Sequence, residues 1–76
     1  MNSKETQYLD VRWLPPPEPF EHITRALQTL PAGSALRVHI HREPFPLYDV
    51  LRESGHAWQT TALADGTFEI LITAAA

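Results

Sequence analysis

Two histidines and one acidic residue have the spacing of metal ligands. His39 and His41 lie two residues apart in an alternating segment, so both side chains leave the same face of a strand. The last strand of the chain is expected beside this one, which places Glu69 on that face. Two imidazoles and a carboxylate can hold zinc or iron with open coordination positions. An ordinary polar outer face is the alternative. We adopt it, assign no cofactor, and keep the metal site as a hypothesis.

Charged side chains also follow two strands that we expect to be parallel and adjacent. Arg12 ends the first strand and Arg42 follows the second. Ligands of open sheets bind beyond the carboxyl ends of strands, where two guanidiniums could grip a carboxylate or a phosphate. The other interpretation is an arginine–carboxylate bridge that ties the two corners together. The residues predicted to form this ligand or partner rim are Asp10, Arg12, Trp13, Pro16, Glu18, Arg42, Glu43, Phe45 and Tyr48.

A run of prolines stands where the first strand turns into the first helix. Helix N-termini bind anions through unpaired backbone N–H groups. Pro16, Pro17 and Pro19 remove most of these donors and Glu18 adds negative charge, so an anion site on this backbone is disfavoured. Two interpretations stay open. One is a rigid corner that lowers the entropy of the unfolded chain, and the other is a partner-binding edge on which Trp13 and the prolines form an exposed apolar patch.

The apolar pattern predicts the elements that position these side chains. An apolar stripe predicts a helix over roughly 17–29, and a shorter helix follows a second proline corner. Alternating segments predict strands, and these are 8–12, 36–41, 57–63 and 67–73. Strand–helix–strand connections imply parallel strands, and Asp65-Gly66 signals a closing antiparallel hairpin. The prediction is an α/β (α+β) two-layer sandwich of order β-α-β-α-β-β, with a four-stranded mixed sheet and both helices on one face.

The length of 76 residues fits a single small domain. We predict that residues 8–73 form this domain, that 1–7 are a disordered tail, and that 74–76 are frayed. With no export signal or long apolar run, the expected location is the cytoplasm and no membrane contact is expected. A bare sheet face or the edge of the third strand could pair two copies, so we expect a monomer or a weak dimer.

Composition excludes several classes of function. The chain has no cysteine, which excludes thiolate chemistry, persulfide transfer and cysteine-ligated metal. Its net charge is −3 and Lys4 is its one lysine, so nucleic acid is not an expected partner. The expected partner is another protein or a small anionic ligand.

Two separated motifs carry a family resemblance. Leu9-Asp10-Val11-Arg12, followed by Pro17-Glu18-Pro19, resembles the opening Leu-Asp-x-Arg-Gly-Leu-x-Cys-Pro-Glu-Pro of the TusA/SirA-like sulfur carriers. The chain is more similar still to the DUF2249 family, in which three prolines precede the Glu-Pro pair and a later Arg-Glu-Pro-x-Pro-Leu follows, here Arg42–Leu47. The resemblance spans residues 8–73 and implies the TusA-like fold.

Departures from the sulfur-carrier pattern remove its chemistry. The persulfide-bearing cysteine of that pattern falls at Pro16, and its glycine falls at Trp13. The resemblance therefore implies no cysteine-dependent sulfurtransferase activity and no catalytic residue. DUF2249 domains occur alone or joined to others, including hemerythrin-like modules, and imply no established activity.

Three hypotheses of different class follow. The leading one is a non-catalytic binding or adaptor module that uses the rim of the two proline corners. The second is a metal- or redox-linked accessory domain that uses His39 and His41. The third is a component of a sulfur or nitrogen-oxide enzyme that uses a rim formed by Arg12 and Arg42, by family analogy only. An exposed patch around Trp13 and Phe45 would favour the first.

Overall fold

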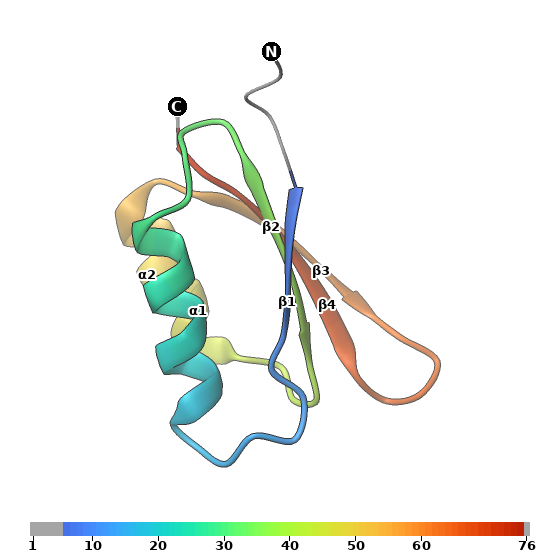
Figure 1. Ribbon diagram of the computed structural model, residues 1–76. Coiled ribbons are helices and arrows are strands. Elements are labelled where there is room, and N and C mark those ends of the chain that lie inside the picture. Colours follow the sequence, from blue (N-terminus) through green and yellow to red (C-terminus); the bar gives the residue numbers. More distant parts are fainter. Residues whose placement is uncertain (1–5, 76) are drawn as a thin grey trace.

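The predicted fold class is confirmed by the computed structural model, which describes residues 6–75 (Figure 1). One layer is a sheet and the other is a pair of helices that cover one of its faces. The elements in chain order are β1 (Thr6–Asp10), α1 (Glu18–Gln28), β2 (Ala35–Ile40), α2 (Phe45–Ser54), β3 (Ala57–Ala62) and β4 (Phe68–Thr73).

The sheet has the order β1-β2-β4-β3, so β2 and β4 are its central strands. β1 runs parallel to β2, whereas β4 is antiparallel to both β2 and β3. The register pairs His39 with Glu69, as expected from the predicted neighbourhood of these two strands. Parallel β1 and β2 bring the ends of both strands, and the proline corners that follow, to the same edge of the sheet (Figure 1).

The core lies between the sheet and the two helices. Alternate residues of β2 and β4 face the helices, and each fully buried aliphatic side chain contributes about 1.5–3 kcal/mol to folding. The first helix contributes Ile23 to this layer, and the second contributes Leu47 and Leu51. The buried core residues are Val11, Ile23, Leu30, Leu36, Val38, Ile40, Leu47, Leu51, Ile70, Ile72 and Ala74.

Local hydrogen bonds explain where the elements stop. The side chain of Asp10 accepts the backbone N–H of Arg12 at 3.0 Å, which turns the chain out of β1 two residues before the predicted end. Gly55 has a φ of 79° and ends α2 in the left-handed conformation, as predicted for a helix cap. Gly66 has a φ of 88° in the predicted hairpin.

Both ends of the domain extend further than predicted. Thr6 and Gln7, assigned to the tail, lie in β1 and pair with β2. Ala74, assigned to the frayed end, is buried, and its N–H donates to the carbonyl of Ser34 at 2.9 Å. The remaining residues of these two predictions, 1–5 and 76, lie outside the described part. Within residues 6–75, neither helix has the length and apolar character needed to cross a bilayer.

Candidate functional site

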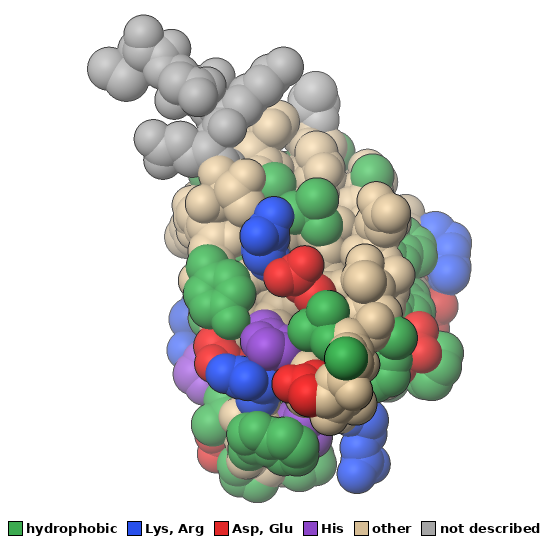
Figure 2. All heavy atoms as spheres, turned by 90° about the vertical axis from the view of Figure 1, so that its right-hand side faces the viewer, with side chains coloured by type: hydrophobic (Ala, Val, Ile, Leu, Met, Phe, Trp, Pro, Cys, Tyr) green, Lys and Arg blue, Asp and Glu red, His purple; other side chains and the backbone are tan. Residues whose placement is uncertain are grey.

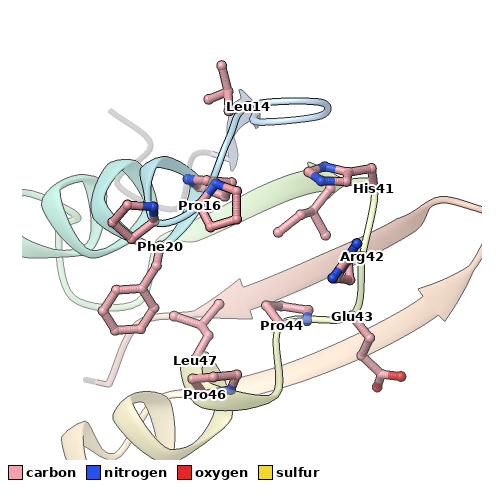
Figure 3. Close-up of a pocket in the computed structure, with 12 residues that line it drawn as sticks. Leu14, Pro16, Phe20, His41, Arg42, Glu43, Pro44, Pro46 and Leu47 are labelled. Carbon is pink, nitrogen blue, oxygen red and sulfur yellow. The ribbon is translucent and has the colours of Figure 1, made fainter.

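An apolar pocket of about 420 Å³ lies between the two proline corners, beyond the ends of β1 and β2 (Figure 3). The first corner and the start of α1 form one wall. The end of β2, the second corner and the start of α2 form the other. Its lining residues are Leu14, Pro16, Pro17, Pro19, Phe20, Ile40, His41, Arg42, Glu43, Pro44, Pro46 and Leu47.

The pocket is continuous with the hydrophobic core, because two of its lining residues are buried core residues. Ile40 and Leu47 belong to the buried cluster and also line the pocket. Phe20 is 37% exposed, and in Figure 3 its ring stands opposite Leu47 and Pro44 around the same hollow. Proline rings have no backbone N–H to offer, so the walls present carbon rather than donors. A volume and an apolar lining of this kind are typical of small-ligand sites.

The first arginine of the predicted rim is neutralised inside its own corner. Arg12 donates from Nε to Asp10 Oδ1 at 3.0 Å and from Nη2 to Asp10 Oδ2 at 2.8 Å. These side-chain bonds, together with the backbone N–H of Arg12, lower the pKa of Asp10 to about 2. The arginine–carboxylate bridge predicted between the corners therefore forms within the first corner. Among residues 6–75, no ion pair joins one corner to the other.

The second corner separates its cation from its carboxylate. Glu43 Oε2 accepts the hydroxyl of Tyr48 at 3.0 Å, and the Glu43 side chain points away from the pocket in Figure 3. The Tyr48 oxygen also lies 2.7 Å from Thr60 Oγ1. Desolvation by burial is the main reason why the pKa of Tyr48 is raised. Arg42 lines the pocket and forms no ion pair or hydrogen bond with any described residue.

The backbone of both corners offers few donors to a ligand. Glu18 N–H, the donor that the prolines of the first corner leave, donates to the carbonyl of Pro15 at 2.9 Å. At the second corner, Phe45 N–H donates to Glu43 and Leu47 N–H donates to Pro44. Polar recognition in this pocket therefore depends on side chains.

Trp13 and His41 form a small unit at the edge of the pocket. Their rings stack with centroids 5.0 Å apart, and the backbone N–H of Trp13 donates to His41 Nδ1 at 2.8 Å. Trp13 has a φ of 67°, a conformation that costs a non-glycine residue roughly 1–2 kcal/mol. The side chain is nevertheless 73% exposed. A large aromatic group is thus held outside the core by a strained turn.

The proposed metal ligands are engaged elsewhere. His39 Nδ1 lies 3.3 Å from the Tyr8 hydroxyl, and His39 Nε2 lies 2.8 Å from Thr67 Oγ1. Glu69 pairs with Arg37 at 3.8 Å. No group of three histidine, aspartate or glutamate side chains within residues 6–75 is arranged to hold a metal ion. The metal site at His39, His41 and Glu69 stays a prediction, with no ligand set assembled.

A polar chain on the open face of the sheet was not predicted. Thr67 donates its hydroxyl to Asp65 Oδ1 at 2.6 Å, so it accepts the proton of His39 Nε2. The same hydroxyl, followed by the Thr67 N–H, lowers the pKa of Asp65. Figure 2 shows this face as a mixture of charged, histidine and apolar side chains. These hydrogen bonds connect the hairpin at Asp65 and Thr67 to His39 of β2, so the polar side chains have a structural role.

The predicted rim is thus partly assembled. Pro16, Arg42 and Glu43 line the pocket, together with His41 from the metal hypothesis. The other rim residues lie around or away from it: Asp10 and Arg12 pair with each other, Trp13 stacks on His41, Glu18 is exposed, and Phe45 packs edge-on against Tyr48. Tyr48 stacks on Trp58 at 5.4 Å.

The apolar lining itself was missed from the sequence. Leu14, Phe20, Pro44 and Pro46 line the pocket, although none of them is among the predicted rim residues. The signal was available: two proline corners follow two parallel, adjacent strands, so they must face each other across one edge of the sheet.

The sequence model of DUF2249, described as "Uncharacterized conserved protein (DUF2249)", matches residues 8–74. No curated protein and no solved structure matches the chain significantly.

Proposed function

The chain belongs to the DUF2249 family, and we propose that it is a non-catalytic binding module whose ligand site is the apolar pocket between the two proline corners. The pocket itself carries this proposal. It combines a volume of about 420 Å³ with walls made mainly of proline, leucine, isoleucine and phenylalanine. Pockets of roughly 300–1,000 Å³ with such a lining are typical of small-ligand sites.

Exposed aromatic side chains near the pocket support the same proposal. Trp13 is 73% exposed and Phe45 is 65% exposed. Large aromatic groups of this kind dominate the energy of binding surfaces when a ligand or partner covers them. The strained backbone of Trp13 is consistent with a functional reason for its exposure.

The other two hypotheses receive less support. A metal-linked accessory domain needs His39 to release two hydrogen bonds and Glu69 to release Arg37. An enzyme component that grips an anion between Arg12 and Arg42 needs Arg12 to leave a bidentate carboxylate.

We also propose that the domain derives from the TusA/SirA-like sulfur carriers. The order of the elements and the Leu9–Arg12 and Pro17–Pro19 motifs support this relationship. Pro16, at the position of their cysteine, now lines the pocket. On this proposal the corner that carries sulfur in the relatives has become part of a binding surface.

Binding of a neutral apolar probe tests the proposed function. We expect saturable binding of naphthylacetamide, followed by calorimetry or by the fluorescence of the naphthalene ring. Phe20→Ser removes an aromatic ring from one wall of the pocket, and Pro16→Asp places a charge against the apolar lining. Each should weaken binding by about fivefold or more, since burying an aromatic ring against carbon is the main source of affinity here.

Tyr8→Ser is the matched control, because Tyr8 is a 58% exposed aromatic residue on the other face of the sheet. It should leave the affinity unchanged. Circular dichroism checks that all variants fold. Failure of the wild-type protein to bind the probe, or equal weakening by Tyr8→Ser and Phe20→Ser, contradicts the proposal.

A further inference from the structure

We infer that the ligand of this pocket is a small organic acid, whose apolar body fills the pocket and whose carboxylate binds the guanidinium of Arg42. This inference rests on the proposed function and adds the chemical class of the ligand. It follows from the way in which charge is distributed between the two corners.

Arg42 is a cation at an apolar pocket without a partner of its own. The neighbouring Arg12 is held by both oxygens of Asp10. Arg42 has no such carboxylate among residues 6–75. An unpaired guanidinium beside a carbon-lined cavity attracts an anion more strongly than one in open water, because the apolar walls screen the charge less.

The nearest acidic residue in the chain is turned away from this cation. Glu43 follows Arg42 directly, yet its carboxylate accepts the Tyr48 hydroxyl at 3.0 Å and points out of the pocket (Figure 3). Tyr48 is fixed in turn by its stack on Trp58 and its bond to Thr60. The Glu43 carboxylate, which could otherwise pair with Arg42, is therefore held away from it by Tyr48.

A carboxylate fits this site better than a phosphate. Several early positions of both helices are prolines, and the N–H groups of Glu18, Glu21 and Leu47 donate to carbonyls, so the backbone has few donors left for a multiply charged anion. One guanidinium matches one carboxylate through two parallel hydrogen bonds. His41 supplies a further donor, because an imidazole that accepts at Nδ1 carries its proton on Nε2 when neutral. No described residue accepts from that Nε2.

The cavity also sets the size of the ligand. A volume of about 420 Å³ lies in the lower part of the range of small-ligand sites, roughly 300–1,000 Å³. An aromatic acid of one or two rings, or an aliphatic acid of similar size, suits a pocket of this volume. A ligand of this size leaves its charged end at the mouth, where Arg42 is exposed.

A matched pair of probes tests the inference. Naphthylacetate and naphthylacetamide have the same apolar body and differ only in the charge of the head group. We expect wild-type protein to bind the acid about fivefold or more tightly than the amide at low salt, and this preference should shrink as salt is added. Arg42→Gln should bring the ratio of the two affinities close to one, because both probes then meet an uncharged side chain. Arg42→Lys should restore part of the preference.

Arg25→Gln is the matched control. It removes the same charge from the last turn of α1, at the opposite end of that helix from the pocket, and should keep the preference for the acid. Equal affinity of the wild-type protein for the two probes overturns the inference, and so does an unchanged preference in Arg42→Gln. If the wild-type protein does not bind naphthylacetamide at all, the proposed function is overturned instead. The two failures are therefore distinct.

Discussion

The two proline corners have the same backbone arrangement but differ in how their charges are paired. Each follows one of two parallel neighbouring strands, and each leads into a helix with proline in its first turn. In the first corner the arginine and the aspartate bind each other. In the second, the glutamate is held by Tyr48 and the arginine faces the pocket alone. The first corner is therefore a closed structural unit, and on our proposal the second corner recognises the ligand.

The largest expected effect concerns how firmly each corner is anchored. Leu47 has no exposed surface and forms part of the pocket at the second corner. Leu47→Ala should lower the free energy of unfolding by about 2–5 kcal/mol. Val11→Ala at the first corner removes less carbon and should cost about 2 kcal/mol. Urea denaturation measures both values. A larger loss for Val11→Ala would show that the first corner is the main anchor.

Tyr48→Phe tests what keeps the charges of the second corner apart. The change removes the hydroxyl that binds Glu43 and Thr60 and should cost about 1–2 kcal/mol of stability. It also frees Glu43 to approach Arg42, so naphthylacetate binding should weaken while naphthylacetamide binding stays constant. Denaturation and probe titrations follow the two effects. Unchanged acid binding would mean that Tyr48 does not control the free charge of Arg42.

Tyr8→Phe is the control for this change. Its hydroxyl lies on the exposed sheet face at 3.3 Å from His39, and its loss should alter stability by less than about 0.5 kcal/mol.

Trp13 offers a smaller test of strain in the first corner. Trp13→Gly and Trp13→Ala both remove the indole and its stack on His41. Only glycine accepts a φ of 67° without cost, so Trp13→Gly should be more stable than Trp13→Ala by about 1 kcal/mol. Thermal denaturation of the two variants measures the difference. Equal stability would indicate that the turn relaxes once the indole is gone.

The smallest expected effect is the acid titration of the first corner. Hydrogen bonds from Arg12 lower the pKa of Asp10 from 3.8 to about 2. A carboxylate whose pKa is lower in the folded state stabilises the fold above its ordinary pKa, and this contribution is lost as the pH falls toward about 2. Asp10→Asn should flatten the stability profile between these values. NMR titration of the Asp10 carboxyl group checks the pKa, and a value near 3.8 would contradict the closed bridge.

The fold could be predicted from the sequence because its signals are local and repeated. Alternation in the strands, the stripe of α1 and Gly55 at the end of α2 depend on near neighbours along the chain. The adjacency of His39 and Glu69 also followed, since the topology allowed few strand orders. The strand limits moved by about two residues where a side chain, that of Asp10, redirected the backbone.

The site was less predictable because the partner of each charged side chain depends on tertiary packing and not on distance along the sequence. Arg42 and Glu43 are neighbours in the sequence, whereas in the fold the Glu43 carboxylate accepts the Tyr48 hydroxyl. His41 was assigned to the sheet face with His39, yet the left-handed turn at Trp13 places a backbone donor against it. Leu14 and Phe20 look like core residues in any periodic pattern, and only the meeting of the two corners makes them a lining.

The most direct test of the central claim is to locate where an apolar probe binds. Amide chemical-shift mapping with naphthylacetamide on the full chain gives this location residue by residue. We expect saturable shifts at Leu14, Phe20, Arg42 and Leu47, on both sides of the pocket. Shifts gathered instead at Tyr8, His39 and Thr67 on the open sheet face, or shifts that never saturate, would contradict it.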